Sequence, residues 1–348
     1  MINIYRLSWI ACIAIMAPLN AYAAELRDVF SQVSAAVVTV GVTQKTQLPI
    51  NNRRQWVSKG ELGSGVLVTP DGKVITAAHL VQTADTVKVR FADGEVVDAR
   101  VIASSPPDDV ALLQLEHVPV GAVVAELGNS EEMAVGDRIF IVGAPYGFSS
   151  TLTVGYISAH HKGAVVAGEL RQSKYFQSDA VINERNSGGP MFNMEGKVVG
   201  IVSHALTPPE GPTGLGFALT VNTAKQVLFE EPSFWSGLDG YLLTEGLAAI
   251  FNLPQPTGML VQHVAEGSPA ARLGLRPGVI TATIDGETML VGGDVVLAVA
   301  GIELSTEAST YDQMRRKLGA LAPGETVTVK VLRAGWVLDL KATVIPAE

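Results

Sequence analysis

Three side chains of this sequence could together carry out nucleophilic catalysis: the hydroxyl of Ser187, the imidazole of His79 and the carboxylate of Asp109. An alcohol becomes a nucleophile when a base takes its proton and a third group orients that base. Backbone N–H groups must also stabilise the oxyanion that forms. Ser187 lies in the segment 186–190, Asn-Ser-Gly-Gly-Pro, where a tight turn can expose the hydroxyl and direct such N–H groups at a substrate carbonyl. These residue types therefore predict acyl transfer through a serine.

The positions of the three residues along the chain make this prediction more specific. A Ser-Gly-Gly sequence alone is a weak signal, since it most often marks a turn. His79, however, follows a strand-like segment that ends at Thr76, and Asp109 directly precedes the apolar run 110–113. The resulting order of histidine, aspartate and serine is the one found in chymotrypsin-like double barrels.

The elements that must position these side chains are predicted to be short strands. Between Val33 and about Val202, runs rich in β-branched residues alternate with Gly, Pro and Asp, which is typical of an all-β sandwich or barrel. The expected strands are 36–42, 65–69, 73–76, 86–91, 96–102, 110–115, 138–142 and 197–202. Pro-Asp-Gly at 70–72 predicts a hairpin turn, and helical periodicity is confined to 25–34 and 223–230.

A second unit follows a polar segment at 230–233, Glu-Glu-Pro-Ser, which suits a linker. Its strand-like segments are 258–264, 294–299, 326–332 and 336–343, and its expected helices are 268–273 and 307–318. The mixture predicts an α+β module.

The N-terminal segment has the features of an export signal. Arg6 precedes an apolar run from Leu7 to Leu19, and Ala-Tyr-Ala at 21–23 has the small-x-small form of a signal-peptidase site. The alternative, a retained membrane anchor, is disfavoured because the run is shorter than the roughly 20 residues that a helix needs to cross a bilayer. We therefore expect cleavage after Ala23 and no membrane span after it.

Composition and charge exclude several other classes. The 348 residues carry 34 acidic and 25 basic side chains, a net charge of −9, without a Lys/Arg-rich block, so nucleic acid is not an expected partner. Cys12 is the single cysteine and lies in the predicted leader, so no disulfide is expected.

Phosphate-loop, Rossmann and zinc signatures are absent, and no cofactor is predicted. His160 and His161 would point to opposite faces of a strand, so no metal site is predicted.

Seven short blocks, in chain order, resemble the HtrA/Deg family of trypsin-like serine proteases. They are Gly-Ser-Gly-Val at 63–66, Asp-Val-Ala-Leu-Leu at 109–113, Leu-Gly-Asn-Ser at 127–130, Val-Gly-Asp at 135–137, Gly-Ala-Pro-Tyr-Gly at 143–147, Gln-Ser-Asp-Ala at 177–180 and Asn-Ser-Gly-Gly-Pro at 186–190. Seven ordered blocks are far more specific than any one of them. The resemblance covers about residues 33 to 228 and implies a mainly β fold, a chymotrypsin-like double β-barrel.

The resemblance assigns roles to the matching positions. Ser187 would be the nucleophile, His79 the general base and later the general acid, and Asp109 the residue that orients His79 and stabilises the imidazolium. Asp109 is preferred to its neighbour Asp108 because the family places its acid directly before the Val-Ala-Leu-Leu run. Asp108 is expected at the surface.

One position departs from the family pattern. The backbone N–H groups of Arg185, Asn186 and Ser187 would form the oxyanion hole, but the family has glycine where this chain has Arg185. If the active turn needs a backbone conformation that glycine adopts cheaply, arginine costs roughly 1–3 kcal/mol of strain. The hypothesis that follows is a slow or switchable protease whose turn is ordered by a ligand.

The family's pocket for the side chain before the cleaved bond matches Ile182, Leu206 and Leu215, which are all aliphatic. Such a pocket would favour small or medium apolar side chains over Arg or Lys, which need a buried acid. The alternative is that these are ordinary core residues, above all Ile182.

The second unit resembles a PDZ domain of the HtrA type. The matching blocks are Gly-Ser-Pro-Ala-Ala at 267–271, Leu-Gly-Leu-Arg-Pro-Gly at 273–278 and Gly-Asp-Val-Val-Leu at 293–297, and the residues 279–292 between them are interpreted as a hairpin insertion. PDZ grooves bind a peptide as an added strand and hold its terminal carboxylate through backbone amides. The corresponding carboxylate loop matches Trp235, Ser236, Gly237 and Leu238. The alternative is a PDZ-like fold that only packs on the protease.

Together these observations predict a signal peptide at 1–23, a trypsin-like protease domain at 24–229, a linker at 230–234 and a PDZ domain at 235–348. The leading hypothesis is an exported, ATP-independent serine endopeptidase that degrades unfolded or damaged proteins in the periplasm or cell envelope, with peptide C-termini bound at the PDZ domain. The resemblance also implies a homotrimer, with the apolar residues near Leu26–Phe30 as a contact.

Two rival hypotheses stay open. The first is a catalytically impaired protease that acts as a peptide-binding chaperone or adaptor because Arg185 prevents the oxyanion hole. The second is a signalling protease that cuts one dedicated partner.

Overall fold

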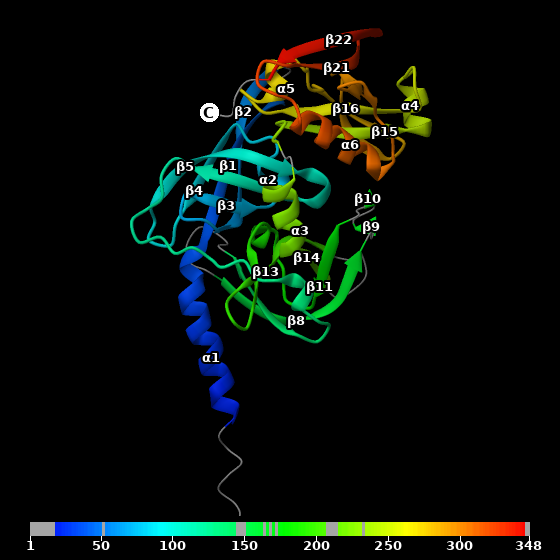
Figure 1. Cartoon of the computed structure of the whole chain (residues 1–348). Helices are drawn as coiled ribbons and strands as arrows, with labels where there is room; N and C mark the ends of the chain where they lie inside the picture. Colours follow the sequence, from blue (N-terminus) through cyan, green and yellow to red (C-terminus); the bar gives the residue numbers. More distant parts are fainter. Residues whose placement is uncertain are drawn as a thin grey trace, which may run out of the picture.

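Two closed six-stranded β-barrels followed by an α+β region make up the chain in the computed structural model (Figure 1). The structure describes residues 18–50, 53–143, 151–162, 165–166, 169–170, 173–206, 215–231 and 234–344. The predicted fold class, a chymotrypsin-like double barrel followed by a PDZ domain, is confirmed.

The first barrel runs in the order β1-β2-β3-β6-β5-β4, with every neighbouring pair antiparallel and β1 closing on β4. Its strands are β1 (Val37–Ile50), β2 (Arg53–Leu67), β3 (Lys73–Thr76), β4 (Thr86–Arg90), β5 (Val96–Ser105) and β6 (Val110–Leu115). In β4 the valines are buried and the polar residues between them are exposed, the period-two pattern of a strand with one face in a core. The predicted turn at 70–72 joins β2 to β3, with Gly72 at φ +91°.

The second barrel runs in the order β11-β14-β13-β12-β7-β8. Its strands are β7 (Arg138–Gly143), β8 (Thr151–Lys162), β11 (Lys174–Ser178), β12 (Pro190–Asn193), β13 (Val198–Leu206) and β14 (Leu215–Thr220), and β9 (Val165–Val166) pairs with β10 (Glu169–Leu170) beside them. Phe140 and Phe192 stack in its core with ring centroids 5.2 Å apart. Four of these strands, β8, β11, β12 and β14, are not among the predicted ones.

Short helical segments connect the strands. They are η1 (Ser34–Ala36), α2 (Ala78–Val81), η2 (Pro106–Asp108), η3 (Ser130–Glu132), η5 (Glu184–Asn186), α3 (Val221–Lys225) and η6 (Gln226–Glu230). Before them, the helix α1 (Pro18–Val33) extends away from the barrels in Figure 1, and its side chains Leu26, Val29, Phe30 and Val33 pack on a core cluster of the chain itself. The predicted leader residues 1–17 lie outside the described residues.

The C-terminal region has one main sheet in the order β15-β16-β19-β21-β22, with β20 paired to β19. Its elements are β15 (Leu238–Thr244), α4 (Glu245–Ile250), β16 (Thr257–Val264), α5 (Pro269–Arg272), β17 (Ile280–Ile284), β18 (Glu287–Val291), β19 (Val295–Val299), β20 (Ile302–Glu303), α6 (Ala308–Gly319), β21 (Thr326–Arg333) and β22 (Trp336–Thr343). The strands β17 and β18 form a separate two-stranded hairpin, which agrees with the hairpin predicted at 279–292. None of the described helices has the length and apolarity of a membrane span.

Candidate active site

His79 is carried by α2, a single helical turn that begins directly after β3. The ring atom Nδ1 lies 2.9 Å from Oδ1 and 3.0 Å from Oδ2 of Asp109, and the backbone N–H of His79 donates to the same carboxylate over 3.1 Å. With Nδ1 held by the carboxylate, Nε2 is left to face a substrate or a nucleophile. The side chain of His79 is 44% exposed, so solvent and ligands can reach it.

Asp109 follows the turn η2 and is buried, with 6% of its surface exposed. Burial raises the pKa of its carboxyl group, but hydrogen bonds from His79 and Ser203 outweigh burial and hold the pKa below its ordinary value. The backbone of Asp109 is left-handed, at φ +54°, a conformation that aspartate tolerates better than most residues. The preference for Asp109 over Asp108 therefore agrees with the geometry.

Asp108 is not the surface residue that was expected. It is half-buried, and its carboxylate accepts hydrogen bonds from Ser105 and Ser173. Its carbonyl accepts one from the hydroxyl of Tyr175 over 3.0 Å. Polar side chains from both barrels contact Asp108. The residues around Asp108 in the sequence do not indicate these contacts.

Ser187 lies at a turn between η5 and β12 and is almost completely buried, at 4% exposure. Gly188 beside it has φ +81°, and a Cβ there would lie 2.4 Å from the carbonyl oxygen of Ser64 and from Oγ1 of Thr76, so the turn requires glycine. Two backbone hydrogen bonds hold the turn in place. The N–H of Ser64 donates to the carbonyl of Ser187 over 2.9 Å, and the N–H of Gly188 donates to the carbonyl of Val202 over 2.7 Å.

The Ser187 hydroxyl donates to the carbonyl of Ser203 over 3.1 Å rather than to the ring of His79. Ser203, which no sequence motif indicates, is 1% exposed, and its own hydroxyl donates to the Asp109 carboxylate. Ser203 thus connects the serine turn to the aspartate. The signal that could have found it is a serine beside His204 in the mostly apolar strand β13.

The turn η5 contains Arg185 and Asn186, two of the three residues predicted to form the oxyanion hole, and Ser187 directly follows it. The N–H of Asn186 donates to the carbonyl of Asn183 over 2.8 Å and is engaged within the turn, while the carbonyl of Arg185 accepts from the Ser64 hydroxyl over 2.7 Å. Arg185 is not among the left-handed residues of the described chain. The turn therefore has a backbone conformation that arginine accepts without strain.

The side chain of Asn186 is a second unusual feature of this turn. It is 1% exposed, yet neither of its amide atoms has a hydrogen-bond partner among the residues that the structure describes. Its Oδ1 lies so close to Gly143 that a Cβ there would approach it to 2.2 Å. Residues 144–147 of the predicted block at 143–147 lie outside the described residues.

The predicted pocket residues are brought near one another by the second barrel. Leu206 and Leu215 are register partners on β13 and β14, and Ile182 lies against Gly216, the neighbour of Leu215. Leu215 is 37% exposed and Ile182 is half-buried. The Leu206 side chain lies outside the described residues.

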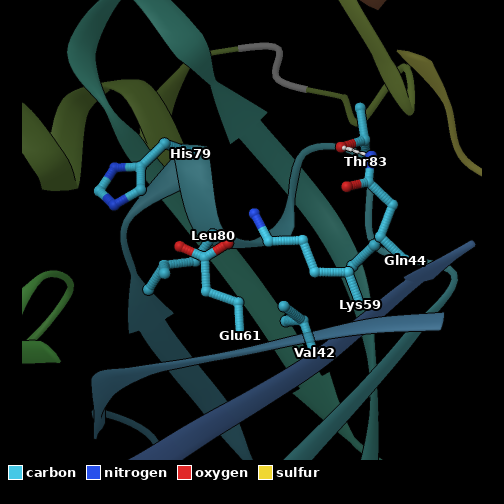
Figure 2. Close-up of a pocket in the computed structure, with 8 residues that line it drawn as sticks. Val42, Gln44, Lys59, Glu61, His79, Leu80 and Thr83 are labelled. Atoms are coloured by element: carbon cyan, nitrogen blue, oxygen red, sulfur yellow. Dashed lines mark hydrogen bonds between the residues drawn. The ribbon is translucent and has the colours of Figure 1, made fainter. Parts of the chain in front are cut away.

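A hollow of about 290 Å³, which includes its open mouth, lies beside His79 (Figure 2). It is lined by Val42, Gln44, Lys59, Glu61, His79, Leu80, Thr83 and Ala84. Gln44 reaches across it to donate to the hydroxyl of Thr83 over 2.9 Å.

Within the described residues, no three His, Cys, Asp or Glu side chains converge as metal ligands. The ring of His161 instead lies 2.9 Å from the amide oxygen of Gln177, and the ring of His160 packs on Phe176.

Models of two known domain families match the chain. The trypsin-like peptidase domain matches residues 63–201, and the PDZ domain matches residues 214–344.

Curated relatives of the chain are named as serine endoproteases. The chain is 33% identical over 315 residues to a probable periplasmic serine endoprotease DegP-like of Pseudomonas fulva (strain 12-X), covering 88% of this chain and 60% of that protein. It is 34% identical over 294 residues to the protein of the same name in Hahella chejuensis (strain KCTC 2396), covering 82% of this chain and 58% of that protein. The chain thus spans about three fifths of the length of these relatives.

Solved structures show the same architecture. The HtrA-type protease AlgW with decapeptide is 27% identical to the chain, with a TM-score of 0.51, and the match covers 93% of this chain and 99% of that one. The complex of AlgW with tripeptide is 26% identical, with a TM-score of 0.50.

Proposed function

Because the chain belongs to the HtrA/Deg family of trypsin-like serine proteases with a PDZ domain, we propose that it is a periplasmic serine endopeptidase that acylates Ser187. The observation that carries the proposal is the contact of His79 with both carboxylate oxygens of the buried Asp109, joined to Ser187 through Ser203. The names of the relatives supply the class of reaction and the compartment.

In the proposed mechanism His79 takes the proton of Ser187 through Nε2 as the hydroxyl oxygen attacks the peptide carbonyl. This requires the Ser187 hydroxyl to leave the Ser203 carbonyl and face the imidazole. Asp109 stays ionised and stabilises the imidazolium, because its pKa lies below the ordinary value. His79 then gives the proton to the leaving amine, and water releases the acyl group by the same steps.

We further propose that the substrates are unfolded or damaged proteins of the cell envelope and that the PDZ domain binds peptide C-termini. The aliphatic Ile182, Leu206 and Leu215 favour an apolar side chain before the cleaved bond. A homotrimer remains part of this proposal. In this chain Leu26 and Phe30 pack on its own core, so a trimer contact there would use the exposed side of α1.

A fluorophosphonate probe tests the acylation directly, because only an assembled serine, base and oxyanion hole react with it quickly. The full chain should become labelled at Ser187, and the Ser187→Ala variant should not. Mass spectrometry of the labelled peptide gives the modified residue. Substrate breadth follows from comparing the proteins cut in an envelope extract by the full chain and by Ser187→Ala.

A second candidate function, a peptide-binding chaperone or adaptor, is favoured by the turn η5. There the N–H of Asn186 is engaged with Asn183, and the Ser187 hydroxyl is bonded away from His79. Absence of labelling together with protection of an unfolded protein from aggregation would select this function over proteolysis.

A further inference from the structure

The strand β22 leaves one edge of its sheet without a partner. It pairs with β21 along one side, and no described strand pairs with its other side. In Figure 1 it lies on the side of the C-terminal region that faces away from the barrels. An unpaired edge readily pairs with another chain unless a proline, a bulge or a short length prevents it. The strand has eight residues, no proline and an unbroken register with β21, so none of these features protects its edge.

The same strand exposes large apolar side chains. Trp336 is 74% exposed, Val337 49% and Leu338 39%, whereas Leu340 and Ala342 are half-buried. Leu340 packs on the core cluster of the C-terminal region. The even-numbered residues of β22 therefore form an apolar row that begins over this core and continues to the exposed end of the strand. Exposed apolar residues along a strand edge favour association with another chain.

The hairpin turn determines which backbone groups of β22 point to the free edge. Ala334 and Gly335 join β21 to β22 with φ +48° and +84°, the two positive values of a type I′ turn. The residues that flank such a turn, Arg333 and Trp336, exchange hydrogen bonds, and bonded and non-bonded pairs then alternate along the ladder. The N–H and C=O of Val344 are both bonded on the β21 side, as this alternation requires. The odd-numbered residues of β22 thus direct their N–H and C=O groups to the free edge.

A second copy of β22 matches this edge in one antiparallel register. Odd-numbered residues must lie opposite odd-numbered residues, because only they have free backbone groups. When Leu340 lies opposite Leu340 of the other copy, Asp339 of each copy lies opposite Lys341 of the other. The neighbouring registers, centred on Asp339 or on Lys341, place like charges opposite each other, which is destabilising. The charges therefore select the register centred on Leu340.

This register also pairs the apolar rows of the two strands. The cross-strand pairs are Leu340 with Leu340, Leu338 with Ala342 and Trp336 with Val344. Apolar cross-strand pairs stabilise a sheet, and these remove the exposed Trp336 and Leu338 from water.

Both charges of β22 are available for such a contact. Asp339 and Lys341 are exposed, and neither forms an ion pair with another of the residues that the structure describes. On β21, Lys330 lies opposite Asp339 in the register of the hairpin. Docking of a second copy would place Asp339 between two lysines on the solvent-facing side of the joined sheet.

We propose that β22 is a docking edge for a second copy of this chain, which pairs with it antiparallel about Leu340 and joins the two sheets into one. This contact does not depend on the proposed catalytic function. It is separate from the trimer contact proposed at α1, because α1 and β22 lie at opposite ends of the molecule (Figure 1). A single strand pair is small compared with the roughly 1,200–2,000 Å² of a stable interface, so the copies associate only in concentrated protein.

Charge reversal in the full chain, followed by sedimentation over a range of concentrations, tests the pairing. Asp339→Lys and Lys341→Asp each place like charges opposite each other and should associate about tenfold more weakly than the natural chain. An equal mixture of the two variants should regain the association, because every cross-strand charge pair is then again of opposite sign. The control Lys88→Asp changes an exposed charge on the first barrel and should associate like the natural chain. Equal thermal unfolding of the four proteins shows that they are folded.

Cysteine cross-linking tests the register. Every variant carries Cys12→Ser, which removes the single natural cysteine. Leu340→Cys should form a disulfide-linked dimer on oxidation, because the two copies of this residue lie opposite each other. Leu338→Cys alone should not, because its two copies are roughly 13 Å apart along the ladder. A mixture of Leu338→Cys and Ala342→Cys should cross-link.

Equal association of the natural chain and both single-charge variants at every concentration would overturn the proposal. So would a mixture of Asp339→Lys and Lys341→Asp that stays dissociated, because the loss would then not come from charges facing each other. A dimer formed by Leu338→Cys and not by Leu340→Cys would overturn the pairing about Leu340.

Discussion

Asp109 should contribute to stability as well as to chemistry, because it is a buried carboxylate with donors on two sides. Its folded pKa lies below the ordinary value of 3.8, so its stabilisation is complete above about pH 4 and is lost as the pH falls through the folded pKa. Asp109→Asn should therefore lower the free energy of unfolding by about 1–3 kcal/mol at neutral pH.

Denaturant titrations of both proteins from pH 7 to pH 3 check this expectation. The difference between them should be constant down to about pH 4 and shrink below it. A difference that grows as the pH falls would show that the carboxylate is not held in its charged form.

Arg185 is expected to slow the proposed acylation of Ser187 through its backbone rather than through its charge. The turn η5 has a conformation that arginine accepts, with the Asn186 N–H engaged inside it. Glycine would let the turn reach left-handed conformations at little cost, so Arg185→Gly should raise the rate of fluorophosphonate labelling about 10- to 100-fold. Arg185→Ala removes the side chain but keeps the backbone restriction, and it should react like the natural chain. Equal labelling rates for the natural chain, Arg185→Gly and Arg185→Ala would exclude an oxyanion hole that forms only when the turn changes its conformation.

At the scale of elements, the turn that carries Ser187 depends on Gly188. Gly188→Ala adds a Cβ within 2.4 Å of backbone and side-chain oxygens at φ +81°, and relief requires β2 and β3 to move. We expect a loss of roughly 3 kcal/mol or more in unfolding free energy and a slower labelling rate.

Gly94→Ala is the matched control, because Gly94 has φ +94° but nothing within 4 Å of an added Cβ. It should cost only about 1 kcal/mol. Comparing the thermal unfolding of the two variants separates the stability lost through steric clash from the stability lost because alanine disfavours a positive φ. Similar losses in both would mean that the close packing around Gly188 relaxes freely.

The sequence predicted at least part of every strand of the first barrel but only β7 and β13 of the second, and the outcome differs between elements for physical reasons. The strands β3, β4 and β6 were found because β-branched residues alternate or run together between clear turn signals. The strand β8 was missed because threonines, Tyr156, and the pair His160 and His161 interrupt its apolar pattern. The edge strand β15 was missed because Asp239 and Gly240 follow its first residue and resemble a turn.

The residues of the candidate site likewise include some that the sequence predicted and some that it did not. The residues His79, Asp109 and Ser187 lie in short motifs whose residue types are required by the chemistry, so they can be recognised in the sequence. Ser203 has no such motif, because its contact with Asp109 arises only when strands that are distant in the sequence are brought together. Contacts across such sequence separations depend on the tertiary fold, which local patterns do not encode.

At the scale of the whole molecule, the PDZ region docks on the first barrel through a few polar contacts. One Asp85 carboxylate accepts from the backbone N–H of Lys45 over 2.6 Å and from that of Glu266 over 2.7 Å. On α6, the mostly buried Arg315 pairs with Glu231. In Figure 1 α6 faces the barrels from the edge of the PDZ region. Such polar interfaces are typical of domains that can shift relative to each other.

Tyr311 on α6 reports on this docking. Burial raises the pKa of Tyr311 to about 12, although the nearby Ser105 hydroxyl opposes the rise and the Asp108 carboxylate adds to it. The folded chain then keeps a proton that the unfolded chain loses near pH 10, so stability falls as the pH rises from about 10 to about 12. The loss should be on the order of 2 kcal/mol.

Denaturant unfolding between pH 9 and pH 12 measures this loss, with Tyr311→Phe as the comparison. The variant lacks the ionisable phenol and should lose less stability over the same interval. An identical decline in both proteins would place Tyr311 in solvent and α6 away from the barrel.

The left-handed backbone of Asp109 restricts which amino acids evolution can place there, whatever the chemistry. Among residues with side chains, aspartate and asparagine adopt φ +54° at least cost. A related chain that has lost activity could therefore keep an acidic residue at this position for the sake of its loop alone. Surveys that sort active from inactive relatives by this residue would misassign such chains. His79 and Ser187 are the safer markers, because their backbones are not left-handed and do not restrict the residue type.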